Sequence, residues 1–133
     1  MKRIKNLLVP KYLFFVIALF WTILVTYSCL VQSSAVPVIN IPNLDKYIHA
    51  FFHFVFTYVW FLFFRKQLKF NTIFKPLLTA FLFSVVFGIV IEILQQLVTT
   101  TRSADFFDFL ANLTGATVAY FTVVICYKYN TLR

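Results

Sequence analysis

The sequence has few charged residues: they make up 12% of its 133 positions, with 12 basic and four acidic side chains. Soluble domains carry about 25% charged and roughly 45–50% apolar residues, whereas 62% of this chain is hydrophobic. The chain therefore has too little polar surface to cover itself in water, which excludes an ordinary soluble domain. The same hydrophobicity excludes an intrinsically disordered chain.

Glycine, proline and cysteine are also scarce, with two, four and two residues respectively. The low glycine and proline counts exclude a collagen-like or low-complexity chain. Cys29 and Cys126 fall near opposite ends of two long apolar stretches, so their separation exceeds the about 7 Å that a disulfide tolerates between Cα atoms. We therefore expect no disulfide and no cysteine-based metal site.

Long apolar runs and aromatic residues, above all 19 Phe, are what the chain has in abundance. A bilayer core is crossed by about 20 helical residues. Four stretches meet this requirement: about 12–31, 47–64, 76–98 and 108–127. The first exceeds the about 7–15 apolar residues of a signal peptide, which favours a retained helix. The pattern predicts an all-α, polytopic membrane protein, a single domain over residues 1–133 with four transmembrane helices in one bundle.

The ends of three of these helices carry start signals. Asn43 or Asp45 is expected to cap the second helix, and Asp105 the fourth, because their side chains can accept the free N–H groups of a first turn. Pro76 fits the first turn of the third helix, where its missing N–H costs nothing.

Basic residues cluster on one side of the predicted spans. Ten of the twelve fall in the two terminal tails or in the loop after the second span: Lys2, Arg3, Lys5, Lys11, Arg65, Lys66, Lys69, Lys75, Lys128 and Arg133. The other two are Lys46 and Arg102. Lys and Arg favour cytoplasmic loops, so both termini are predicted to be cytoplasmic in a multi-pass protein of the cell (plasma or inner) membrane. The basic residues then meet anionic membrane lipids, and nucleic-acid binding is not expected.

Polar residues within or beside the spans repeat every three or four positions, which places them on one face of a helix. They are Asp45, Lys46, His49 and His53 at the second span, Glu92, Gln95 and Gln96 at the third, and Arg102, Asp105, Asp108 and Asn112 around the start of the fourth. An ionisable residue inside a membrane is by default a functional-site hypothesis. We expect one polar pocket on the outer side, whose wall is formed by Glu92, His49, His53, Arg102, Asp108 and Asn112. Glu92 is expected to be protonated or paired with His53 or Arg102.

Each of these residues also has a structural interpretation. Asp45 and Asp108 fit helix caps, while Lys46, His49 and Arg102 fit interfacial positions. Gln95 and Asn112 fit hydrogen bonds between helices. A further pair, Gly115 and Ala119, has the small-xxx-small spacing typical of close helix packing.

Taken in order, these motifs resemble a known family. The string Asp45-Lys46-x-x-His49 is followed by Glu92-x-x-Gln95, by Arg102 and by Asp108-x-x-x-Asn112-x-x-Gly115. Over about residues 40–120 this pattern resembles the VanZ-like family of small bacterial membrane proteins, associated with resistance to the glycopeptide teicoplanin. The resemblance implies a four-helix membrane domain in which these residues matter together, but it supplies no reaction. Ala119 stands where a second small Gly would often appear.

Three functions remain open on these grounds. The first is a cell-envelope binding or resistance factor, with a glycopeptide antibiotic or a cell-wall lipid intermediate as partner. The second is an intramembrane enzyme in which Glu92, His49 and His53 act in acid–base catalysis or, with a carboxylate, hold a divalent metal. The third is a proton-coupled carrier, disfavoured because the inner halves of the spans are almost wholly apolar.

The site residues divide into two predicted groups. Glu92, His49 and His53 are the candidate catalytic residues. The candidate binding residues are Asp45, Lys46, Gln95, Arg102, Asp105, Asp108, Asn112 and Gly115. No resident metal or cofactor is predicted, because two histidines four residues apart recur by chance.

Overall fold

The computed structural model describes residues 12–31, 41–68, 72–100 and 105–131. These residues form four helices and no strand: α1 (Leu13–Leu30), α2 (Leu44–Gln67), α3 (Phe74–Val98) and α4 (Phe106–Thr131). Each helix is long and apolar enough to cross a membrane, which confirms the expectation of an all-α protein with four candidate spans. The largest difference from the predicted boundaries is in α4, which continues to Thr131 instead of ending near residue 127.

The helix starts differ in how they are stabilised. At α4 the expected cap is confirmed, since Asp105 Oδ1 accepts the backbone N–H of Phe107 at 2.9 Å. The expected cap at α2 is wrong: Asn43 precedes the helix with φ 57° and makes no side-chain cap hydrogen bond, and Asp45 lies inside the helix. At this end of α2 the N–H of Leu44 is bonded to the carbonyl of Ile41, and the carbonyl of Asn43 accepts from the N–H groups of Lys46 and Tyr47. Pro76 lies in the first turn of α3, as expected.

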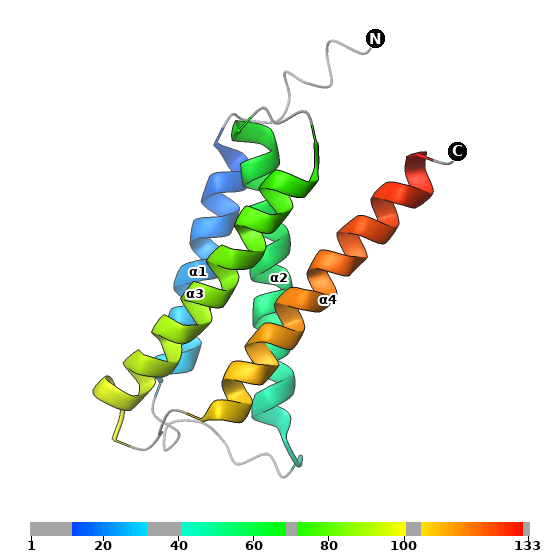
Figure 1. The fold of residues 1–133 in the computed structure, drawn as a ribbon. Helices are drawn as coiled ribbons and strands as arrows, with labels where there is room; N and C mark the ends of the chain where they lie inside the picture. The colour runs from blue at the N-terminus through cyan, green and yellow to red at the C-terminus, as the bar shows by residue number, and fades with distance from the viewer. Residues whose placement is uncertain (1–11, 32–40, 69–71, 101–104, 132–133) are drawn as a thin grey trace.

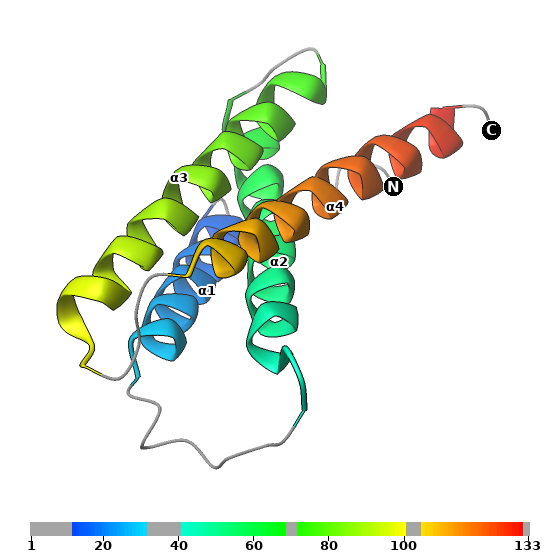
Figure 2. The same cartoon turned by 60° about the horizontal axis from the view of Figure 1, so that its bottom comes forward.

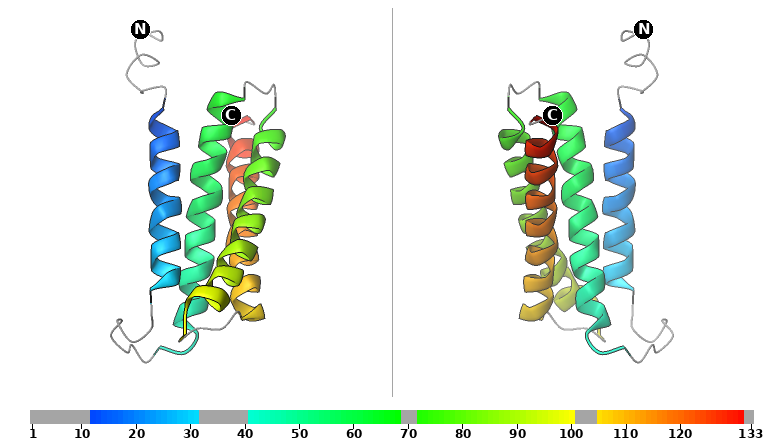
Figure 3. Two further views of the ribbon diagram at one scale, coloured as in Figure 1. Left: turned by 90° about the vertical axis from the view of Figure 1, so that its left-hand side faces the viewer. Right: turned by 90° about the vertical axis from the view of Figure 1, so that its right-hand side faces the viewer.

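The second helix is the centre of the bundle. α2 packs against α1, α3 and α4, and α3 also packs against α1 and α4. α1 and α4 make no contact with each other, so they lie on different sides of the α2–α3 pair (Figures 1 and 3). Successive helices run in opposite directions, so α1 begins and α4 ends at the same end of the bundle (Figure 1).

Aromatic residues fill the core around α2. The rings of Phe56 and Phe87 stack with centroids 4.5 Å apart, and Trp60 packs edge-on against Phe83 at 4.8 Å. Trp60 also donates its indole N–H to Thr22 Oγ1 at 3.1 Å. Such pairs add about 0.5–1.5 kcal/mol each to the burial of area, and they fix α1, α2 and α3 to one another.

Small residues bring α4 close to α2 near one end of both helices. Gly115 is buried, and a Cβ atom added to it would overlap the backbone carbonyl of Ala50. Ala116 and Ala119 are fully buried beside it. From this crossing point α4 runs away from the bundle toward its C-terminal end (Figures 1 and 2).

Candidate functional site

Helices α2 and α4 begin, and α3 ends, at the same end of the bundle (Figure 1), where polar side chains of the three helices meet. We call this the polar end of the bundle. Its residues are Asp45, Lys46 and His49 of α2, Glu92 of α3, Asp105 just before α4, and Asp108 and Asn112 of α4. The helical spacing seen in the sequence explains which residues share a face, and the antiparallel packing of the three helices brings these faces together.

Three buried side chains form a hydrogen-bonded chain at the polar end. Asn112 is central: its Oδ1 lies 3.0 Å from His49 Nδ1, and its Nδ2 donates to Glu92 Oε1 at 3.2 Å. His49 Nδ1 and Glu92 Oε1 are themselves 3.9 Å apart. Because an amide oxygen can only accept, the network places a proton on His49 Nδ1. In the neutral form of the imidazole, Nε2 is then the acceptor.

Both carboxylate oxygens of Glu92 face a hydrogen-bond donor. Its Oε2 faces the backbone N–H of Asp105 at 3.5 Å, while Oε1 accepts from Asn112. The whole residue is only 7% exposed. Burial of a carboxylate is costly unless hydrogen bonds replace those it loses to water, and the Asn112 amide and the Asp105 N–H supply two such donors.

A cluster of opposite charges lies beside this chain. Lys46 Nζ is 3.1 Å from Asp45 Oδ2, 3.2 Å from Asp105 Oδ2 and 3.1 Å from Asp108 Oδ1. The Asp108 side chain is only 13% exposed, so its pair with Lys46 is the least screened by solvent. The backbone N–H of Phe107, and after it the Lys46 ammonium, hold the pKa of Asp105 below its ordinary value. Three carboxylates around one ammonium leave this cluster negative.

Two predicted site residues lie apart from the chain. His53 is one helical turn farther along α2, and its Nδ1 is 2.9 Å from Ser84 Oγ. Of the two partners expected for Glu92, His53 is thus engaged with Ser84, and His49 is the histidine that lies near Glu92. Gln95 donates to the carbonyl of Cys29 at 3.0 Å and so joins α3 to α1. Arg102 lies outside the described residues.

Two grooves reach the polar chain from different sides. One, of about 330 Å³, lies between α1 and α2 and is lined by His49 and Asp45 with Tyr27 and Phe52. The other, of about 370 Å³, lies between α3 and α4 and is lined by Glu92 and Asp105 with apolar neighbours. Instead of one polar pocket, the structure has two grooves here, one lined by His49 and the other by Glu92. Each groove combines mostly apolar walls with ionisable groups.

The polar end also contains a set of atoms that suits a metal ion. One ligand atom each from His49, Glu92 and Asp108 lies within 4.8 Å of the others. One imidazole and two carboxylates are ligands that Zn²⁺ and other divalent ions accept. The predicted histidine pair does not make this set, because His53 bonds to Ser84.

Sequence reasoning gave little weight to two residues of α3. Ser84 is fully buried as the partner of His53. Gly88 is one of two glycines in the chain, and a Cβ there would lie 3.1 Å from His53 Cε1 and 3.3 Å from Asn112 Cβ. The signal was present in the spacing, since positions 84, 88 and 92 are four residues apart and share a helix face.

Fold and site together define an all-helical protein with four candidate membrane spans and a polar cluster at one end of the bundle. Comparisons with protein-family models, with curated proteins and with solved structures found no match.

Proposed function

We propose that the chain is a multi-pass protein of a bacterial plasma membrane, with four transmembrane helices, cytoplasmic termini and the polar end on the outer side. Support comes from the basic residues. Of the five that the structure describes, Lys46 lies at the polar end, whereas Arg65 and Lys66 end α2, Lys75 begins α3 and Lys128 lies near the end of α4. These ends of α2, α3 and α4 lie together at the opposite end of the bundle (Figure 1). Such a bias of Lys and Arg marks cytoplasmic ends.

We further propose that the protein is a cell-envelope binding or resistance factor that takes up an amphiphilic ligand at the outer leaflet. The observation that carries this proposal is the buried His49–Asn112–Glu92 chain, which is reached from two apolar grooves between helices. A purely structural network has no need of such access. The resemblance to VanZ-like proteins also favours this function, with a glycopeptide or a cell-wall lipid intermediate as the ligand.

The charge at the polar end limits which charged groups the ligand can carry. Lys46 is already engaged by three carboxylates, so it is poorly placed to bind a further anion. The excess of carboxylates favours a ligand that carries an amino group, which can pair with Asp45 or Asp105, and an apolar tail that fits a groove.

The test is growth of a teicoplanin-sensitive bacterium that expresses the chain. We expect the chain to raise the inhibitory concentration, and Glu92→Gln to abolish this gain because the amide removes the negative charge while keeping the shape. Gln96→Ala is the matched control: Gln96 is exposed on the same helix, and its removal should leave the gain intact. Membrane abundance of each variant is followed by immunoblot.

Protection that persists in Glu92→Gln at equal abundance would contradict the proposed role of the polar end. A chain that gives no protection against teicoplanin or related lipoglycopeptides would contradict the resistance function itself.

A second candidate is a metal-dependent enzyme acting on a lipid-linked substrate. The observation in its favour is the set formed by His49, Glu92 and Asp108. A divalent ion held there would activate a water molecule at the end of an apolar groove.

Purified protein in detergent should then carry about one metal ion per chain, a ratio that follows from three ligands in one site. The His49→Ala variant should lose the metal, and the His53→Ala variant should keep it. If wild-type protein binds no metal after incubation with Zn²⁺ and Mn²⁺, this candidate function is excluded.

A further inference from the structure

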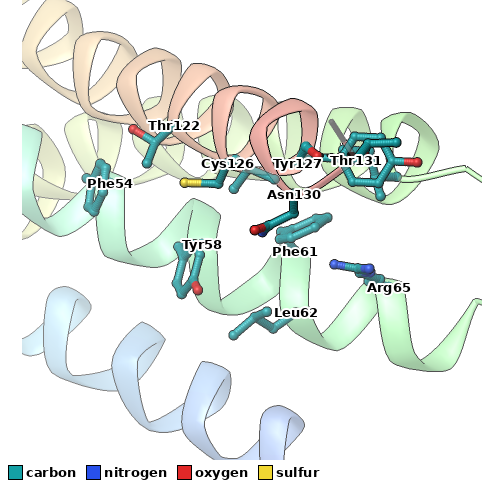
Figure 4. A pocket seen from close by; sticks show the side chains of 12 residues that line it. Phe54, Tyr58, Phe61, Leu62, Arg65, Thr122, Cys126, Tyr127, Asn130 and Thr131 are labelled. Carbon is teal, nitrogen blue, oxygen red and sulfur yellow. Dashed lines mark hydrogen bonds between the residues drawn. The ribbon is translucent and has the colours of Figure 1, made fainter. Parts of the chain in front are cut away.

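A third groove separates α2 from α4 at the end of the bundle opposite the polar end (Figure 4). We call it the α2–α4 groove. Its volume is about 720 Å³, within the about 300–1,000 Å³ typical of sites for small ligands. Its walls are mainly apolar and include Phe54, Phe61 and Leu62, while Arg65 of α2 and Asn130 of α4 add polar groups toward the helix ends.

The groove follows from the way α4 rests on α2. Gly115 lies directly against the backbone of Ala50, which sets the point of closest approach. Val123 is the last buried residue of α4, and from Ile125 to Thr131 every residue is exposed. The two helices therefore diverge over the last two turns, and the space between them is not filled by side chains of the described residues.

No acidic side chain lies at this groove to form an ion pair with the guanidinium of Arg65. The Arg65 guanidinium lies 5.9 Å from the centroid of the Phe61 ring, on the groove wall. The chain has only four acidic side chains, and all of them, Asp45, Glu92, Asp105 and Asp108, belong to the polar end. An anion that pairs with Arg65 must therefore come from outside the chain's acidic residues.

An apolar groove with a cation at its rim matches an anionic amphiphile. We propose that the α2–α4 groove binds an anionic phospholipid, with one acyl chain along the aromatic wall and the phosphate on the Arg65 guanidinium. The Asn130 amide can donate a further hydrogen bond to the headgroup. This site lies at the opposite end of the bundle from the proposed envelope-binding function and is independent of it.

The test is native mass spectrometry of the full chain in detergent with equal amounts of phosphatidylglycerol and phosphatidylcholine. We expect wild-type protein to retain one phosphatidylglycerol in preference to phosphatidylcholine. Arg65→Gln should lower this retention about tenfold or more, since it removes a charge-assisted hydrogen bond. Lys66→Gln is the matched control, because the Lys66 ammonium lies 5.1 Å from the Phe14 ring on the α1 side, and it should retain the lipid.

A second pair of variants tests the groove without changing charge. Cys126 lines the groove and is exposed, so Cys126→Trp should fill the space and displace the acyl chain while leaving the core intact. Ile125→Trp places the same indole at a neighbouring position that is exposed and outside the groove, and should not displace the lipid.

Three results of the lipid-binding measurements would overturn the proposal. They are equal retention of the two lipids, retention by Arg65→Gln as strong as by wild type, and unchanged binding in Cys126→Trp. A lipid-free dimer cross-linked through Cys126 under mild oxidation would likewise overturn it, by assigning the groove to a second copy of the chain.

Discussion

Asn112 is the residue that links the two ionisable side chains of the polar end. Its amide has a donor and an acceptor side by side, so it can satisfy Glu92 and His49 at once. A carboxylate or an ammonium at this position could satisfy only one of them. The side chain is only 2% exposed, so water cannot easily replace these bonds.

Asn112→Leu should therefore destabilise the protein while nearly preserving side-chain volume. The substitution leaves His49 Nδ1 and Glu92 Oε1 without their partner, and each orphaned buried group costs about 1–3 kcal/mol. We expect a clear fall in the midpoint of thermal unfolding, measured in detergent by intrinsic tryptophan fluorescence.

Thr114→Val provides the comparison on the same helix. Thr114 is exposed and bonds only to the carbonyl of Leu110, one turn before it, so its replacement should change stability by no more than about 0.5 kcal/mol. Equal midpoints for the two variants would mean that the His49–Asn112–Glu92 chain contributes nothing to stability.

At the level of the helices, α2 and α4 depend on a backbone contact. The Cβ of any residue other than glycine at position 115 would overlap the Ala50 carbonyl, which belongs to the α2 backbone and cannot rotate away. At Gly88 the nearest atoms are instead side-chain atoms of His53 and Asn112, which can shift by a few tenths of an ångström.

Gly115→Ala should consequently be far more damaging than Gly88→Ala. Overpacking in a tight core costs about 1–3 kcal/mol, and at Gly115 the two helices must also separate. We expect Gly115→Ala to reduce the yield of monodisperse protein in size-exclusion chromatography, with Gly88→Ala close to wild type. Similar elution and yield for the two variants would show that the α2–α4 contact is looser than described.

The ends of the helices could not be predicted as well from the sequence as the helices themselves. The apolar runs located all four helices, because apolar length determines a candidate span. They placed the start of the second helix near residue 47, whereas α2 begins at Leu44. Backbone hydrogen bonds continue through Asp45 and Lys46 regardless of side-chain polarity, so a pattern based on hydropathy cannot locate such an end.

For the molecule as a whole, periodicity predicted the faces but not their partners. The spacing of His49 and His53 places both on one face of α2, yet only His49 reaches Asn112, while His53 meets Ser84. That choice depends on how far α3 and α4 slide along α2, which the Gly115–Ala50 contact helps to set. A register of this kind arises from packing among distant segments and has no local signal.

The divergence of α4 also leaves its last two turns with little support from the rest of the bundle. The residues from Ile125 to Thr131 are exposed, and the C-terminal end of α4 stands apart from α2 (Figure 1). In a bilayer these turns would be surrounded mainly by lipid. A helix end with so few protein contacts can change its tilt when the thickness of the bilayer changes, so the angle between α2 and α4 should vary with the length of the lipid acyl chains.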